Sequence, residues 1–252
     1  MLVLFLNALN YSLILELIKK VIRNFLKMHS QIVQELLKAE DKAFNLFNVA
    51  ETRGLIVAGK TEKQLNEQLY ALAFELYGIK KFWHKRIVRA GKNTLHPYRE
   101  NPPDLVIQND DILFFDFGPV FEDWEADVGR TYVIGNDPLK HKLKSDIELA
   151  WKESRDWFFT QEHITGAEYY QYNVELAKKY GWEFGGDIAG HLIGNFPHEK
   201  IESESRDNYI HPDNQKDMFA PGVLGTKREW ILEIHFVDKQ KQIGGFVEQL
   251  LI

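Results

Sequence analysis

Five short apolar runs of β-prone residues each carry one acidic residue or histidine, inside the run or at its edge. These five residues are Asp116, Asp127, His191, Glu233 and Glu248. A carboxylate in an apolar strand is costly to bury unless it is paired or bound to a cation. For any one of the five, an outward-facing strand position or a buried ion pair is the simpler explanation. Five in one chain weaken that simpler explanation, although periodicity alone does not prove that the strands converge.

A hydrolytic centre with two metal ions needs such a set of residues. Two divalent ions about 3.5–4 Å apart share bridging carboxylates, and rigid strands hold such ligands best. The chain has no cysteine, so any metal would be bound by oxygen and imidazole ligands. These ligands suit Mn, Co, Fe or Zn and do not distinguish among them. A site of this kind would take two divalent metal ions as cofactors, but the periodicity of the runs alone does not show that the five residues meet.

The rest of the pattern indicates one α+β domain, since no linker or repeat divides the chain. Helical periodicity predicts helices over residues 29–52, from Thr61 to Tyr77, over 139–159 and over 168–180. Apolar β-prone runs predict strands at residues 87–88, 105–107, 112–115, 131–134, 230–237 and 245–252. Because the strands at 112–115 and 131–134 are joined by a hairpin-length connection, Asp116 and Asp127 should lie close together.

Residues 1–27 are expected to form a helical N-terminal extension, because apolar residues recur at helical spacing from Ile14 to Phe25. Polar residues such as Asn7 and Glu16 interrupt the apolar run, which argues against a membrane-spanning helix. A secretory signal would need basic residues before the run and a cleavage site after it. An extra packing helix, or a true start at Met28, explains the segment better than a membrane anchor. We expect a cytoplasmic protein.

The charge balance argues against nucleic acid as a partner. There are 31 lysines and arginines and 37 acidic residues, giving a net charge of -6, whereas nucleic-acid-binding domains are usually basic. One locally basic stretch, from Lys80 to Lys92, also contains Trp83 and His84. In an acidic chain such a stretch is expected to be a solvated face rather than a nucleic-acid site.

Two spaced motifs connect the five candidate residues to a known family. Asp116 is followed eleven residues later by Asp127 and then by Arg130-Thr131, and His191 stands in Gly190-His191-Leu192-Ile193-Gly194. A second histidine, His198, follows His191 by seven residues. This arrangement resembles the pita-bread metallopeptidases, which include methionine aminopeptidase, Xaa-Pro aminopeptidase and prolidase. The resemblance extends over roughly residues 35 to 252.

The resemblance implies a pita-bread fold, in which helices flank a curved, mainly antiparallel sheet, with residues 28–252 as a single catalytic domain. It also implies the metal ligands. Asp116 would bind one metal ion, and His191 with Glu233 would bind the other. Asp127 and Glu248 would bridge the two ions.

The same resemblance implies three catalytic roles. Glu233 would accept a proton from the attacking water and donate it to the leaving amine. His198 would stabilise the oxyanion of the tetrahedral intermediate. His96 would contact the scissile peptide from the other side. For His96 and His198 the alternative is an ordinary loop histidine, and the surrounding motifs favour the functional role.

Two departures from the family pattern affect the expected substrate more than the metals. Ile234-His235 follows Glu233 in place of a proline, and Lys200-Ile201 follows the second histidine motif. Within the first histidine motif, Leu192 replaces the central glycine. We expect an aminopeptidase that removes one N-terminal residue from a peptide, as a monomer or homodimer. Xaa-Pro cleavage is slightly favoured over methionine removal. Methionine removal stays a close alternative because the part of the chain before Asp116 is short. The alternatives are an inactive pita-bread module that binds a peptide or protein, and a metal-free hydrolase resembling creatinase.

Overall fold

The fold was analysed in a computed structural model, which describes residues 31–196, 206–222, 225 and 227–252. The predicted extension over residues 1–27 and the predicted catalytic residue His198 lie outside the described residues. Within them, no helix combines the length and the apolar character needed to cross a membrane.

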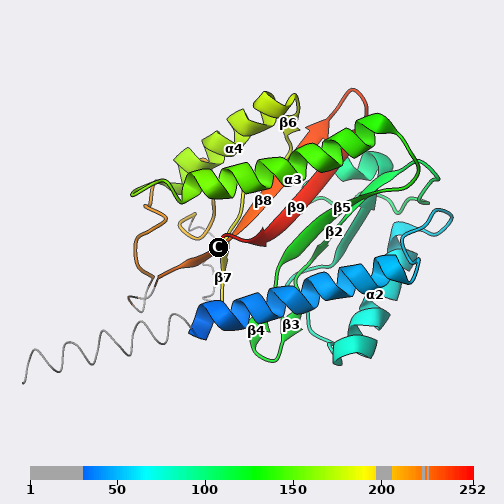
Figure 1. The fold of residues 1–252 in the computed structure, drawn as a ribbon, viewed down its shortest axis with the longest axis horizontal. Helices are drawn as coiled ribbons and strands as arrows, with labels where there is room; N and C mark the ends of the chain where they lie inside the picture. The colour runs from blue at the N-terminus through cyan, green and yellow to red at the C-terminus, as the bar shows by residue number, and fades with distance from the viewer. Residues whose placement is uncertain (1–30, 197–205, 223–224, 226) are drawn as a thin grey trace, which may run out of the picture.

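A seven-stranded sheet of antiparallel pairs forms the centre of the molecule (Figure 1). Its strands follow the order β1-β2-β5-β9-β8-β6, with β7 paired to β8. They span β1 Ile87–Ala90, β2 Ile112–Phe117, β5 Val128–Val133, β6 Glu183–Phe184, β7 Leu192–Ile193, β8 Glu229–Asp238 and β9 Ile243–Leu250. A small hairpin of β3 Val120–Phe121 and β4 Trp124–Glu125 connects β2 to β5. The predicted α+β pattern and pairing of the Asp116 and Asp127 strands are confirmed.

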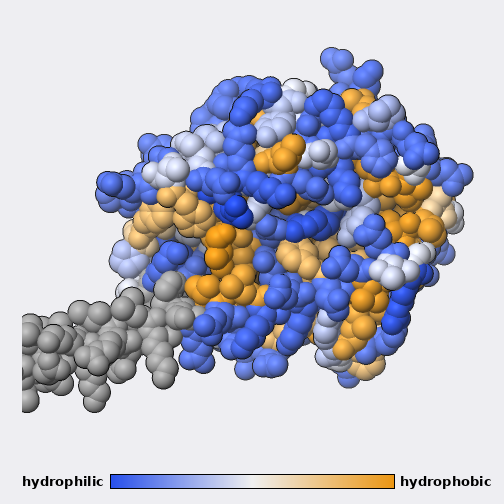
Figure 2. Space-filling view, viewed as in Figure 1, coloured by the Kyte–Doolittle hydropathy of each residue, from blue (hydrophilic) through white to orange (hydrophobic). Residues whose placement is uncertain are grey.

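Helices cover both faces of this sheet. A helix over residues 31–52 and α2 Glu62–Tyr77 lie on one side, and α3 Pro138–Phe158 and α4 Gly166–Tyr180 lie on the other (Figure 1). Two apolar clusters fill the two layers: one contains Phe47 and Phe115, and the other contains Trp151 and Phe236. Hydrophilic residues cover most of the face seen in Figure 2, and apolar residues show there in separate patches.

The helix boundaries follow from capping residues. Thr61 caps α2 by accepting from the Gln64 amide, and Gln64 completes a capping box. Asp137 caps α3 in front of Pro138, which suits the first helical turn because its missing N–H would be unpaired there. These starts agree with the predicted helices to within two residues.

The predicted strand at residues 105–107 is wrong. In this segment only Val106 makes a bridge, to Thr61. The backbone of Ile107 instead pairs with the turn before α2, donating to Lys60 O over 2.9 Å and accepting from Gly59 N over 2.9 Å. Pro102 and Pro103 precede the segment and lack the N–H groups that a sheet strand would donate.

Candidate metal centre

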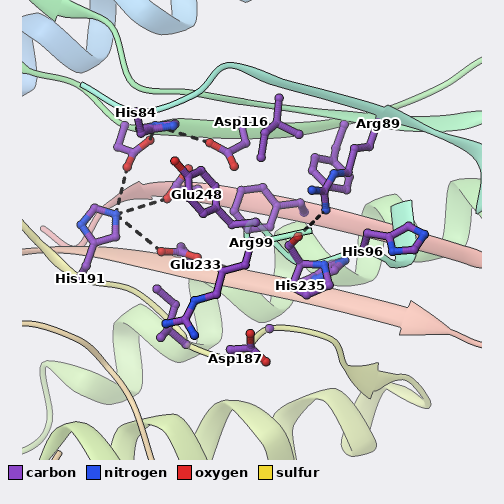
Figure 3. A pocket seen from close by; sticks show the side chains of 18 of the residues that line it. His84, Arg89, His96, Arg99, Asp116, Asp187, His191, Glu233, His235 and Glu248 are labelled. Atoms are coloured by element: carbon purple, nitrogen blue, oxygen red, sulfur yellow. Dashed lines mark hydrogen bonds and ion pairs between the residues drawn. The ribbon is translucent and has the colours of Figure 1, made fainter. Parts of the chain in front are cut away.

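The five predicted ligands converge at one end of the sheet. Asp116 lies in β2 and Asp127 directly precedes β5, which pairs with β2. Glu233 on β8 and Glu248 on β9 lie directly opposite each other. His191 precedes β7 and points toward the glutamates (Figure 3). Three strands and two strand ends therefore bring together the residues that the sequence distributes over more than a hundred positions.

Gly129 lets the strands of the two bridging candidates approach. It pairs with Glu248 across β5 and β9. A Cβ atom at Gly129 would lie 2.5 Å from the Phe246 ring and 2.9 Å from Glu248 Cβ. No real side chain tolerates such contacts, so glycine at this position is required for the register that faces Glu248 toward Asp127.

Gly190 fixes the position of His191 in a similar way. Its φ of 142° lies in a region that favours glycine. A Cβ atom there would lie 2.0 Å from Ile231 O. This close approach lets the backbone clamp β8, since Ile231 N donates to His191 O over 2.8 Å and Glu233 N donates to Ala189 O over 2.9 Å. The clamp holds the side chains of His191 and Glu233 in register.

Asp127 is the centre of the polar contacts. Its Oδ2 accepts from His191 Nε2 over 3.0 Å, and its Oδ1 accepts from His84 Nε2 over 3.0 Å. His191 Nε2 also lies 3.6 Å from Glu233 Oε1 and 3.8 Å from Glu248 Oε1. On the other side, His84 Nε2 lies 3.6 Å from Asp116 Oδ1. One carboxylate thus joins two groups of potential ligands.

His84 is the residue that sequence reasoning missed. The expectation that the basic stretch from Lys80 to Lys92 is a solvated face is wrong for part of it. The His84 side chain is only 7% exposed, and Arg89 is buried. Since Ile87 pairs with Asp116, the chain just before β1 returns to the end of β2, where His84 meets both aspartates. The available signal was a histidine three residues before a predicted strand. This signal could be interpreted only with knowledge that β1 pairs with β2.

Burial and crowding of carboxylates shift the pKa values in this cluster. Burial raises the pKa of Asp116 to about 6 and that of Glu233 to about 8, against the opposing charges of the histidines. Burial and the charge of Asp127 raise the pKa of Glu248 well above its usual value. Asp127 behaves oppositely: burial would raise its pKa, but His84 and His191 outweigh burial and lower it to about 2.

The two histidines respond to the same charges. Burial alone would lower the pKa of His84, but the charges of Asp127 and Asp116 outweigh it and raise the pKa to about 9. The Asp127 hydrogen bond likewise raises the pKa of His191 well above its usual value, against burial. The cluster is thus rich in negative charge that only protons or cations can neutralise.

The donor set fits divalent cations. Within the described chain, Glu248 Oε2 is buried and has no hydrogen-bond partner, which is costly for a carboxylate oxygen unless a cation binds there. Two groups have ligand atoms all within 4.8 Å of one another: His84, Asp116 and Asp127 form one, and Asp127, His191 and Glu248 form the other. Their shared member, Asp127, is one of the two residues that the family resemblance predicts to bridge two ions.

The cluster lies in a cavity of about 240 Å³ (Figure 3). Ile87, Phe114 and Phe246 form an apolar part of its wall. The predicted catalytic residue His96 also lines the cavity, but it pairs with Glu100 and lies apart from the carboxylates in Figure 3. The structure therefore brings the five predicted ligands together and leaves His96 at the cavity wall.

His235 and Arg89 line the same cavity as buried residues. His235 Nε2 donates to Thr94 O over 2.8 Å, and burial lowers the pKa of His235 to about 4, so its ring is neutral at pH 7. Arg89 donates to Pro97 O over 2.8 Å and to Glu100 O over 2.9 Å. These bonds hold the loop after η1 Gly91–Leu95 at the cavity.

The antiparallel sheet between helical layers, with an acid and imidazole cluster at one end, is a pita-bread fold. Solved structures share it: an X-Pro aminopeptidase from Thermotoga maritima superposes with a TM-score of 0.68 at 21% identity, covering 88% of this chain and 60% of that one. A methionine aminopeptidase from Rickettsia prowazekii gives a TM-score of 0.63 at 14% identity, covering 86% of this chain and 91% of that one.

The sequence profile of metallopeptidase family M24 matches residues 18–226, and the chain belongs to this family. Among curated proteins, it is 24% identical over 233 residues to a Xaa-Pro dipeptidase from Pyrococcus horikoshii. That match covers 88% of this chain and 65% of the relative. The chain thus spans less than two thirds of this relative. The family and fold expected from the sequence are confirmed.

Proposed function

We propose that this chain is a dinuclear metal-dependent aminopeptidase that hydrolyses the first peptide bond of a peptide with a free N-terminus. The observation that carries this proposal is the sharing of Asp127 between two adjacent groups of potential ligands. A bridging carboxylate of this kind is what two divalent ions a few ångströms apart require. Membership of family M24 and the relatives that cleave Xaa-Pro bonds support the same reaction class.

Five residues would hold the ions: Asp116, Asp127, His191, Glu233 and Glu248. Bound ions would polarise the scissile carbonyl and make a water molecule more acidic. Glu233 would move the proton from that water to the leaving amine. Burial raises the pKa of Glu233 to about 8 in the metal-free cluster, and bound cations would lower it so that the carboxylate could accept a proton. The roles proposed for His96, at the cavity wall, and His198 remain predictions from the family motifs.

Within this class we favour peptides with proline in the second position. The Xaa-Pro enzymes among the relatives support this preference. The apolar wall of Ile87, Phe114 and Phe246 offers a surface on which the flat, apolar proline ring could pack. A neutral, buried His235 next to Glu233 would add a polar group without adding charge to this pocket.

Peptide hydrolysis with defined substrates tests the proposal. Protein loaded with Co²⁺, Mn²⁺ or Zn²⁺ would be incubated with Ala-Pro-Ala, Met-Ala-Ser and N-acetyl-Ala-Pro-Ala, and the released amino acids measured. We expect release of alanine from Ala-Pro-Ala, slower release of methionine, and no cleavage of the acetylated peptide.

Two aspartate variants serve as controls. Asp127→Ala should abolish activity, whereas Asp110→Ala, which alters an exposed aspartate outside the cavity, should retain it. Cleavage of neither free peptide with any of the metals would refute the peptidase proposal and favour a peptide-binding module. Full activity of Asp127→Ala would refute the assigned site.

A further inference from the structure

We propose that His84 is a sixth protein ligand of the metal centre, binding the ion on the Asp116 side. This inference rests on the proposed dinuclear function. The family motifs behind that proposal include only the five ligands named above. It assigns one imidazole to each ion: His84 to the first and His191 to the second.

The geometry of His84 fits direct ligation. Its Nε2 lies 3.0 Å from Asp127 Oδ1 and 3.6 Å from Asp116 Oδ1. With metal–ligand distances of about 2.0–2.2 Å, neighbouring ligand atoms around one ion are separated by roughly 3.0–3.5 Å. An ion between these three atoms would thus need only small shifts of the side chains. His84 and both aspartate side chains are nearly inaccessible to solvent, so few water molecules could replace a missing protein ligand.

His84 and His191 are held in the same way. His84 Nδ1 donates to the carbonyl of the next residue, Lys85, over 2.7 Å, and His191 Nδ1 donates to Leu192 O over 2.8 Å. A carbonyl oxygen only accepts, so each Nδ1 carries a proton. Each Nε2 donates to Asp127 in this structure and would lose its proton when its lone pair binds a metal ion. The two Nε2 atoms contact the two different oxygens of Asp127. The imidazoles are therefore related through Asp127 as equivalent ligands of two adjacent ions.

The backbone forms a socket for the His84 ring. A Cβ atom at Gly118 would lie 2.2 Å from His84 Cδ2 and 2.3 Å from His84 Nε2. Trp83 is fixed on both sides, by N–H donation to Gly118 O over 2.9 Å and by Nε1 donation to Ala126 O over 3.0 Å. Its indole ring makes edge contacts with both histidine rings, at centroid distances of 4.4 Å to His84 and 5.2 Å to His191. A ring held this tightly is suited to ligation, which requires fixed geometry.

A second imidazole changes the expected metal preference. Carboxylates suit Mn²⁺ and Mg²⁺, whereas imidazole favours Zn²⁺, Co²⁺ and Fe²⁺. With His84 as a ligand, the Asp116 side would hold Zn²⁺ and Co²⁺ more tightly than a site made of carboxylates alone. Loss of the His84 imidazole should therefore weaken the binding of Zn²⁺ and Co²⁺ more than that of Mn²⁺.

Titration calorimetry with Co²⁺, Zn²⁺ and Mn²⁺ tests this on the full chain, with three variants. Wild type should bind two ions. His84→Ala should keep one tight ion and weaken the other at least tenfold for Co²⁺ and Zn²⁺, with partial recovery on adding free imidazole. Gly118→Ala, which retains the histidine but fills its socket, should show the same loss. His163→Ala removes a histidine that is exposed and outside the cavity, and should bind as wild type does.

Proton NMR of the Co²⁺-loaded protein gives a direct readout. Imidazole N–H protons of cobalt ligands are strongly shifted and exchange with solvent. Wild type should show two such signals, from Nδ1 of His84 and of His191, and His84→Ala should lose one of them. Far-UV circular dichroism would verify that each variant is folded.

The outcomes separate this inference from the proposed function. If wild type binds no ions, or if Asp127→Ala binds them as well as wild type, the dinuclear proposal itself fails. If wild type binds two ions and Asp127→Ala loses them, but His84→Ala retains both affinities and both shifted signals, only the role of His84 is refuted. In that case His84 would be an ion-pair partner of the aspartates.

Discussion

Replacing Gly190 by alanine should destabilise the protein and distort the metal centre together. The residue has a φ of 142°, and a Cβ atom would lie 2.0 Å from Ile231 O. The unfavourable backbone conformation costs about 1–3 kcal/mol for a residue with a side chain. Moving β8 away by about 1 Å adds a packing cost of about 1–3 kcal/mol. We therefore expect the free energy of unfolding to fall by about 4 kcal/mol, and the Tm by about 8–16 °C.

Gly181→Ala is the matched control. Gly181 caps α4 with a φ of 85°, but nothing lies within 4 Å of the position that a Cβ atom would take there. It should lose no more than about 2 kcal/mol, from backbone conformation alone. Urea unfolding and calorimetric titration with Co²⁺ would be measured for both variants. Only Gly190→Ala should also weaken Co²⁺ binding. The reason is that β8 carries Glu233, and the backbone N–H of Glu233 donates a hydrogen bond to the segment that carries His191. Equal destabilisation of the two variants, with unchanged Co²⁺ affinity, would refute this reasoning.

Three further predictions concern stability. Burial raises the pKa of Glu40 from 4.5 to about 7, so the stability that this residue contributes is present in acid and lost as pH rises through 7. In urea unfolding, wild type should lose about 2 kcal/mol relative to Glu40→Gln between about pH 5.5 and pH 8.5. Parallel pH dependence of the two proteins would contradict this. Removing metal with EDTA should lower the Tm by about 5–10 °C from the value at a metal concentration about 100 times Kd, and adding Co²⁺ should restore it. Trp151→Phe removes the 3.0 Å hydrogen bond from α3 to Leu232 O and should cost about 1–3 kcal/mol, whereas a cost near zero would show that the bond is unimportant.

The helices could be read from the sequence because their signals are local, and the five candidate ligands because ordered family motifs mark them. Thr61 with Gln64 marks the start of α2 within four residues. Each predicted ligand stands out against its own apolar run, and ordered spacing connects the five. In such cases the information that defines the feature lies within a short stretch of chain or in its order.

The position of His84 could not be read in this way. Basic residues such as Lys81, Lys85 and Arg86 flank the run Phe82-Trp83-His84, so the local charge pattern indicates a solvated surface. Its burial depends on the pairing of β1 with β2 and on the space that Gly118 leaves, and both depend on residues about thirty positions away. The wrong prediction of a strand at residues 105–107 has the same cause. The backbone partners of this segment are in the turn before α2, far away in the sequence.

Charge balance links these observations to the number of ions. The cavity holds four clustered carboxylates, from Asp116, Asp127, Glu233 and Glu248. Two divalent ions with neutral imidazoles at His84 and His191 would cancel this charge, whereas one ion would leave two buried negative charges that protons must neutralise. Protons neutralise the same groups when ions are absent, so filling the centre should release about four protons at neutral pH. Calorimetric titration with Zn²⁺ in buffers of different ionisation enthalpy measures that number. Release of two protons or fewer would favour a single ion and contradict the dinuclear centre.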